Sequence, residues 1–336
     1  MSPLLSGRPS RLIGVAVGLA LIALAVYASI TLGMVTISWQ SLTDAYSRFD
    51  GSNQQLVIRD VRVPRALIAA AVGTSLGMSG ALIQALTRNP LADVGILGIN
   101  NGASLFVVAA VSLLSVSSLS QYVWFAFAGA AVSGIFVYWL GSIGRNGLTP
   151  VKITLAGAAI GALASSFTHT LLLLNERTMQ EVLFWLAGSV EGRKLELLVQ
   201  VLPYLAIGWV VALIVAGPLH TLTLGEDVAT GLGQRTVLVK LVTGLVIVVL
   251  AGSSVSVAGP ILFVGLVTPH IARHLVGSNT RWVVLYSAML GAILLLAADL
   301  AARFVAMPKE VPIGVMTALI GTPFFLYTAR KGNFRK

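Results

Sequence analysis

The chain has 336 residues, of which 57% are apolar and 10% are charged, and its mean hydropathy is +0.91. An ordinary soluble domain has about 25% charged residues, so this composition excludes a cytosolic enzyme and a disordered chain and indicates a protein solvated mostly by lipid. The chain has no cysteine, which excludes disulfides and thiolate metal sites, and its net charge of +10 fits cytoplasmic Lys and Arg of a membrane protein better than nucleic-acid binding.

Ten apolar segments follow one another along the chain, and a spanning helix needs about 20 such residues. They predict spans at 12–34, 64–86, 94–114, 121–142, 152–174, 198–217, 236–257, 261–274, 281–301 and 311–329. The eighth segment is short and is flanked by Pro260 and Pro269, so we expect a half-span or a kinked helix there. The expected fold is all-α and polytopic, with residues 1–336 forming one transmembrane domain.

The first segment follows Arg8 and Arg11 and is longer than the apolar region of a usual signal peptide, so we expect a retained helix. Placing both termini in the cytoplasm puts 13 of the 22 Lys and Arg on the inner side, a modest positive-inside bias. The basic tail at 331–336 is the strongest single anchor for this orientation.

Small residues recur at helical spacing in two predicted spans. Gly73 and Gly77, and likewise Gly157 and Gly161, lie four residues apart on one helix face, which favours close approach of neighbouring helices in lipid.

Three segments between the spans are long enough to have structure of their own. The expected outer segments are 35–61, which is polar, and 175–197, in which residues 181–186 predict a short amphipathic helix lying on the membrane. The longest inner loop is expected at 218–235.

Several chemistries are missing from the sequence. No phosphate-binding G-x-x-x-x-G-K-[ST] motif occurs, so the chain is not expected to bind ATP or Mg²⁺ itself. His270 and His274 have metal-ligand spacing, but Arg273 beside them would repel a cation, so no metal site is expected. Asp299 and Arg303 stand at i and i+4, and their spacing favours a charge pair that makes a span end tolerable in lipid.

Three stretches rich in Gly, Pro and charge carry a family resemblance. They comprise RVPR at 62–65, RNPLA at 88–92 and GINNGA at 98–103, then LGEDVATGLG at 224–233, and then GPILFVGLVTPHIAR at 259–273, ADLAAR at 298–303, EVPIG at 310–314 and GTPFF at 321–325. Together they resemble the permease subunit of the ABC importers for iron–siderophores, haem and vitamin B12, over residues 56 to 330.

The resemblance implies a permease of ten helices in the plasma (inner) membrane that works with several partners. These are a second permease subunit, identical or paralogous, two cytoplasmic ATPase subunits that bind the ATP and Mg²⁺, and an extracytoplasmic binding protein. The importer would expose a central path to each side in turn. Iron–siderophore is the first expected cargo, with vitamin B12 and haem as alternatives.

The resemblance also implies roles for residues at matching positions. Arg62, Arg65 and Arg303 match arginines that dock the binding protein, and guanidinium suits this because it forms bidentate pairs with carboxylates. The alternatives are anchoring to lipid headgroups, pairing of Arg65 with Asp60, and pairing of Arg303 with Asp299.

On the inner side, the segment with Gly225, Glu226, Asp227, Gly231 and Gly233 is short, polar and bounded by glycine. The resemblance implies a short helix that docks in a groove of the ATPase, and the alternative is a solvated loop. Glu226 is expected to contact the ATPase.

Five residues are candidates for the path. Thr149 enters the fifth span where the family has a gate, and Ser165 and His169 lie on one face of that span, which lines the path in the family. Asn100 and Asn101 would bend a helix beside the path, because irregular polar backbone is tolerated in lipid only where protein or water covers it. The alternatives are interhelical hydrogen bonds for the first pair and bundle shaping for the second.

A different class of protein, an ion-coupled secondary transporter, would also fit the composition. It predicts carboxylates within the membrane for ion coupling, and Asp299 is the one available. An intramembrane enzyme is opposed by the missing catalytic constellations.

Overall fold

A computed structural model describes residues 3–33, 37–143 and 149–331, and every regular element in these ranges is helical, as expected. The longer helices are α1 (Arg8–Thr31), α4 (Val63–Thr87), α5 (Ile99–Leu114), α6 (Leu119–Ser142), α7 (Pro150–Leu174), α9 (Leu195–Thr223), α11 (Thr236–Ala258), α12 (Val264–Val276), α13 (Thr280–Val305) and α14 (Ile313–Lys331). The shorter elements are α2 (Trp39–Ser47), α3 (Asn53–Val57), the π-helical turn η1 (Ile58–Arg62), the 3₁₀ turn η2 (Val94–Leu97), α8 (Glu176–Leu186) and α10 (Glu226–Gly231).

Each of the ten predicted segments overlaps one of the longer helices. Within the described residues, seven helical stretches are long and apolar enough to cross a membrane, one of them the continuous run of α3, η1 and α4. The apolar helices α5 and α14 are shorter, and α12 has 13 residues, in keeping with the expected half-span. Lys331, the first residue of the basic tail, ends α14, and the rest of the tail, 332–336, lies outside the described residues.

The predicted boundary of the sixth span is wrong. The sequence places its end at 217, whereas α9 continues through Pro218 to Thr223. A proline inside a helix costs about 3 kcal/mol. Leu219 and Leu222 are buried in the next turn, and their packing keeps the chain helical beyond Pro218.

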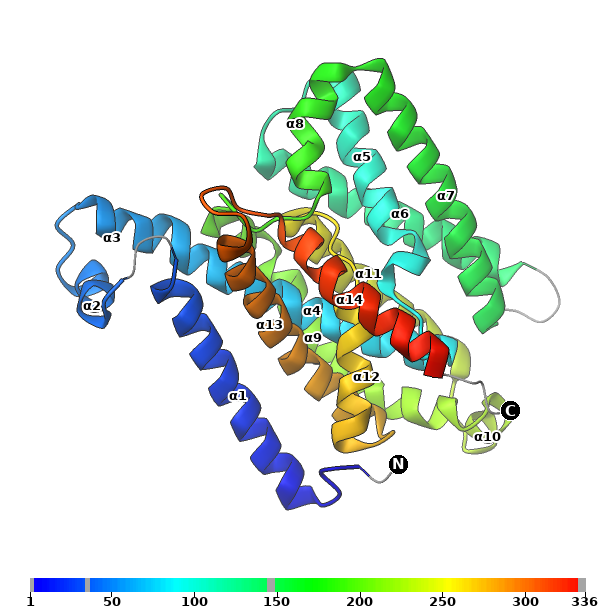
Figure 1. Cartoon of the computed structure of the whole chain (residues 1–336). Coiled ribbons are helices and arrows are strands. Elements are labelled where there is room, and N and C mark those ends of the chain that lie inside the picture. Colours follow the sequence, from blue (N-terminus) through cyan, green and yellow to red (C-terminus); the bar gives the residue numbers. More distant parts are fainter. Residues whose placement is uncertain (1–2, 34–36, 144–148, 332–336) are drawn as a thin grey trace.

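Helix α4 lies at the centre of the bundle. It packs against α13, α11, α12, α9 and α1, and Figure 1 shows these helices around it, with α5 to α8 forming the other side of the molecule. By contrast, α1 contacts mainly α13 and leaves most of its surface exposed. The bundle therefore has a buried axis and a broad apolar surface that suits lipid.

Glycines set how closely α4 approaches its neighbours. A methyl group on Gly73 would lie 2.3 Å from the carbonyl oxygen of Gly291 in α13. One on Gly77 would lie 2.1 Å from the oxygen of Ser287, and one on Gly80 would lie 2.0 Å from the oxygen of Gly265 in α12. The close approach predicted for Gly73 and Gly77 is confirmed.

Replacing Gly80 by alanine should therefore destabilise the bundle by about 1–3 kcal/mol, because the added methyl overlaps backbone that cannot rotate away. The matched control is Gly244→Ala in α11, where a methyl group meets nothing within 4 Å. The thermal unfolding midpoint in detergent should fall for the first variant and hold for the second. Equal midpoints would contradict the packing described here.

The bundle has two distinct ends. Helices α2 and α3 and the 306–312 connection lie at one end, the α2 end. Helix α10 and the 277–279 turn lie at the other, the α10 end, and Figure 1 shows α2 and α10 far apart. The amphipathic helix predicted at 181–186 is present as part of α8, and its position on a membrane stays a prediction.

Candidate functional site

Three arginines expected to act together meet at the α2 end. Arg62 ends η1, Arg65 lies in the first turn of α4, and Arg303 lies in the last turn of α13. Arg65 and Arg303 bind Asp299, whose side chain is fully buried, and Arg62 lines the same cavity as the other two arginines. We call this group, with Glu310, the outer arginine cluster.

Ion pairs hold the cluster together. The Nε of Arg65 lies 2.7 Å from Oδ1 of Asp299, and its Nη1 lies 2.6 Å from Oε2 of Glu310. Arg303 binds the second carboxylate oxygen of Asp299, so the predicted i, i+4 pair is confirmed. Asp299 thus lies between two guanidinium groups. Pairing of Arg65 with Asp60, the alternative by proximity in sequence, is wrong, because Arg65 pairs with Asp299 and Glu310 while Asp60 is exposed.

The same arginines cap the end of α1. Arg62 donates from Nη1 to the carbonyl oxygens of Ile30 at 2.8 Å and Thr31 at 3.2 Å. Arg303 donates to the oxygen of Ser29 at 2.6 Å and to its Oγ at 2.8 Å. Helix C-termini leave unpaired carbonyls and carry partial negative charge, so cations are favoured there. The cluster therefore locks α1, α4 and α13 together.

These contacts bury the arginines, which expose 8%, 5% and 4% of their surface for residues 62, 65 and 303. They also line a cavity of about 560 Å³, the outer cavity, together with Glu310, Gly33, Ile37 and residues of the 53–61 segment. Access to the guanidinium groups is therefore through this cavity, and docking of a binding protein stays a prediction.

The segment expected to couple to an ATPase forms a short helix, α10. Gly225 precedes it with φ of 140° and Gly233 follows it with φ of 79°, backbone conformations that favour glycine. Ala229 is buried, while Asp227, Val228 and Leu232 are exposed. The helix is therefore fixed by one side and presents the other outward.

An ion pair fixes α10 to α11. Both carboxylate oxygens of Glu226 accept from Nζ of Lys240, at 2.7 and 2.8 Å, and Oε1 also accepts from the hydroxyl of Thr236 at 3.2 Å. The hydrogen bond from Lys240 lowers the pKa of Glu226. A lowered pKa means that this contact is fully present above the ordinary value of 4.5 and is lost as pH falls through the lowered pKa of Glu226. The sequence did not indicate Lys240.

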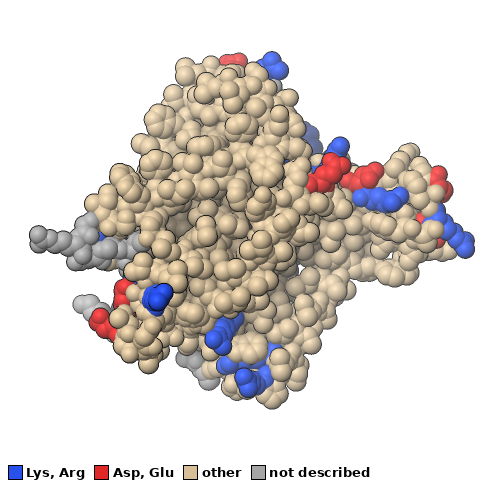
Figure 2. Space-filling view, turned by 180° about the vertical axis from the view of Figure 1, so that it is seen from behind, with Lys and Arg blue, Asp and Glu red and all other residues tan. Residues whose placement is uncertain are grey.

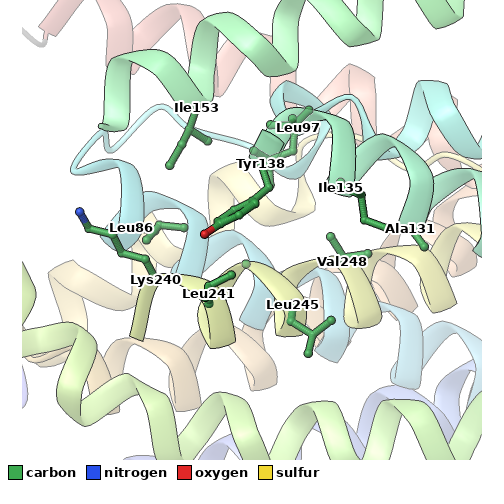
Figure 3. Close-up of a pocket in the computed structure, with 13 residues that line it drawn as sticks. Leu86, Leu97, Ala131, Ile135, Tyr138, Ile153, Lys240, Leu241, Leu245 and Val248 are labelled. Carbon is green, nitrogen blue, oxygen red and sulfur yellow. The ribbon is translucent and has the colours of Figure 1, made fainter. Parts of the chain in front are cut away.

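The stem of Lys240 lines an apolar cavity of about 270 Å³ between α6, α11 and the start of α7. Figure 3 shows Tyr138 and Val248 pointing into this cavity, while the nitrogen of Lys240 lies at its edge. A buried stem with an outward ammonium group is the usual behaviour of lysine beside apolar surface. The packing of the stem restricts where the ammonium group can meet Glu226.

Four of the five predicted path residues line one cavity. Asn100 and Asn101 come from α5, and Ser165 and His169 come from α7, around a space of about 460 Å³. We call it the chamber. Asn101 donates to the oxygen of Gly161 at 3.1 Å, whereas Oδ1 of the buried Asn100 has no hydrogen-bond partner in the described part of the chain.

Thr149 lies elsewhere, at the α10 end, where its hydroxyl caps α7 by accepting from the N–H of Lys152. The chamber wall is completed by Ser104 and Thr168 and by apolar and small residues that were not predicted to line a path, namely Leu172, Leu186, Ala187, Pro260, Leu262, Gly314, Val315 and Ala318. Pro260 and Leu262 belong to the non-helical stretch before α12, whose interruption in the sequence was the available signal.

Comparisons with known proteins agree with one another. A family model described as the FecCD transport family matches residues 21–331. YfiZ of Bacillus subtilis (strain 168), a probable siderophore transport system permease protein, is 52% identical over 308 residues, which are 92% of each chain. FepD of Escherichia coli (strain K12), a ferric enterobactin transport system permease protein, is 39% identical over 322 residues, 96% of each chain.

Among solved structures, an inward-facing ABC transporter described as of metal-chelate type superposes with a TM-score of 0.82. Its identity is 27%, and the match covers 97% of this chain and 100% of that one.

Proposed function

The chain belongs to the FecCD transport family, and we propose that it is the permease subunit of a binding-protein-dependent ABC importer for an iron–siderophore complex. The observation that supports this most is the match along almost the whole chain to permeases named for siderophore and ferric enterobactin transport. Deleting the gene should abolish growth on one ferric siderophore as the iron source, and a plasmid copy should restore it.

In this proposal ten helices span the plasma membrane, namely α1, α4, α5, α6, α7, α9, α11, α12, α13 and α14. Both termini and the α10 end lie in the cytoplasm, and the α2 end lies outside. The basic residues beside α1 and at the start of α13 support this orientation through the positive-inside rule.

The partners are a second permease subunit, two ATPase subunits and a soluble binding protein. The ATP and Mg²⁺ belong to the ATPases, and no catalytic step is assigned to this chain. The exposed side of α10, with Asp227, Val228 and Leu232, is the surface that enters the ATPase groove. Glu226 is exposed beside Asp227, so it contacts the ATPase as well, and it also holds α10 to Lys240.

The chamber belongs to the path between the two permeases. Helix α7 exposes Ser166, His169 and Leu173 along one face, and a second permease is the partner that would cover this face. The polar groups of the chamber, among them Asn100, Ser165 and His169, would meet a polar cargo. They would not bind iron directly, because a siderophore already occupies the coordination sites of the metal.

The outer cavity is the dock for the binding protein. An acidic side chain of the binding protein would enter it and meet the guanidinium groups of Arg62, Arg65 and Arg303. The cluster holds three cations and two carboxylates, so its net positive charge favours an incoming carboxylate.

Replacing Arg62 by glutamine should weaken association with the binding protein about tenfold and flatten its dependence on salt. The matched control is Arg59→Gln, because Arg59 is three residues away but stacks on Phe49, 4.5 Å from the ring centre, and does not line the cavity. Surface plasmon resonance on the detergent-solubilised importer measures the affinity for the binding protein and its dependence on salt, for each of the two variants. Unchanged affinity of the Arg62 variant at low salt would contradict docking in the cavity.

A further inference from the structure

A second polar cavity, of about 230 Å³, lies at the α10 end, where α4 and α9 finish and α13 begins. We call it the inner arginine pocket. Its polar lining residues are Gln84, Arg88, Thr223, Arg273, Ser278 and Thr280. Two guanidinium groups therefore line one small space whose described lining includes no Asp or Glu.

Each arginine is held in place by an uncharged acceptor, and the carboxylate of Glu226, which Lys240 binds, acts on Arg88 from outside the pocket lining. Arg88 donates from Nη2 to the carbonyl oxygen of Leu222 at 2.7 Å, and Arg273 donates to Oε1 of Gln84. Gln84 is fixed in turn, because its Nε2 donates to the oxygen of Ala92 at 3.1 Å. In the described part of the chain neither arginine forms an ion pair. A guanidinium group has five N–H donors, so most of them remain available to a ligand.

The electrostatics of the pocket favour an anion. Two cations that line one partly buried space repel each other, and an anion between them turns that repulsion into attraction. The N-terminus of the 26-residue helix α13 lies at the pocket wall and adds partial positive charge. The hydroxyl of Ser278 is exposed beside it.

The depth of the pocket indicates the source of the anion. Trp282 lies between the lining residues Thr280 and Val283, and the guanidinium of Arg11 stacks over its ring at 5.6 Å. Tyr286 donates to the backbone oxygen of Arg11 at 2.7 Å. Trp and Tyr beside basic residues mark the headgroup level of a membrane. Figure 2 shows basic side chains at the lower edge of the molecule, where α1 and α13 begin.

We propose that the inner arginine pocket binds the phosphate group of an anionic phospholipid from the cytoplasmic leaflet. Arg88 and Arg273 bind the phosphate oxygens, and Ser278 donates a further hydrogen bond. Basic pockets between spanning helices at the cytoplasmic face are suited to such headgroups, and arginine forms paired hydrogen bonds with phosphate. The inference uses the orientation given under the proposed function. A bound lipid would brace the ends of α4 and α9 that support α10.

The test is lipid binding by the full-length permease, purified with its partner subunits and analysed by native mass spectrometry. Phosphatidylglycerol is the probe, phosphatidylcholine is the matched zwitterionic lipid, and inorganic phosphate is the soluble anion. The variants are Arg88→Asn and Arg273→Gln. Asparagine suits position 88, because the φ of Arg88 is 50° and asparagine tolerates the left-handed region better than most residues. Arg235→Gln is the control, since Arg235 is exposed at the same end but does not line the pocket.

Phosphatidylglycerol should bind more tightly than phosphatidylcholine, and the double variant should weaken it about tenfold or more. Arg88→Asn alone, and Arg273→Gln alone, should each give part of that loss, and Arg235→Gln should give none. Unfolding midpoints measured without added lipid show whether the variants are folded. If the double variant is unfolded, the single variant Arg88→Asn is used for the test.

Equal binding of the two lipids, or unchanged binding in Arg88→Asn, would overturn the inference. If inorganic phosphate raises the unfolding midpoint as much as phosphatidylglycerol does, the anion does not come from a lipid, and that part of the inference is overturned. If the variants weaken copurification of the ATPase and leave phosphatidylglycerol binding unchanged, the pocket binds a carboxylate of that subunit, and the inference is overturned as well. None of these outcomes depends on transport, so the proposed function stands or fails separately.

Discussion

Replacing Asp299 by alanine should destabilise the protein by about 3–5 kcal/mol, because two buried arginines would lose the carboxylate that both of them bind. Arg65 would keep Glu310, but Arg303 would have no ion-pair partner in the described part of the chain. Helix α1 would loosen as well, since Ser29 donates to Asp299 and is bound by Arg303. We expect low membrane levels and no transport.

The control for this variant is Asp60→Ala, because Asp60 is an exposed acid at the same end of the molecule. Thermal unfolding in detergent and the amount of protein in membranes are the two measurements. A midpoint for Asp299→Ala equal to that of Asp60→Ala would show that the outer arginine cluster does not hold α1, α4 and α13 together.

Charge reversal at Glu226 should reduce transport by about tenfold or more while leaving the membrane bundle folded. Lysine at this position would face Lys240, so repulsion would replace the ion pair that orients α10. The compensating variant Lys240→Glu restores the pair with its charges exchanged, and the double variant should recover most of the transport. Uptake and ATP hydrolysis, measured on the same preparation, report the coupling.

Asp227→Lys is the matched comparison, because Asp227 is the next residue on α10 and is exposed. Its defect, arising at the ATPase surface, should not be repaired by Lys240→Glu. If Lys240→Glu fails to repair Glu226→Lys while the ATPase still copurifies, Glu226 acts by contacting the ATPase and not by orienting α10.

Much of the fold could be predicted because lipid imposes simple requirements. A spanning helix must be long and apolar, so each predicted segment coincides with a helix. Boundaries could be predicted less well where packing decides them: the sixth apolar segment was expected to end at 217, but the buried Leu219 keeps α9 helical through Pro218. The break before α12 was indicated by Pro260, whereas the chamber that it helps to line depends on contacts between segments far apart in sequence.

The sites show the same division. Local spacing was enough to pair Asp299 with Arg303, because the two residues share a helix face. Spacing cannot show that Arg65 reaches Asp299 and Glu310, which lie more than 200 residues along the chain. Lys240 was missed for the same reason, since its bond to Glu226 exists only after α10 folds back on α11.

Uptake by the reconstituted importer tests the central claim most directly. The permease is placed in liposomes with its ATPase subunit, the binding protein is added outside, and a ferric siderophore carrying radioactive iron is supplied. The account predicts accumulation only when the ATPase, internal ATP and the binding protein are all present, with ATP hydrolysis rising when loaded binding protein is added. Accumulation driven by an ion gradient without ATP or the ATPase would contradict it.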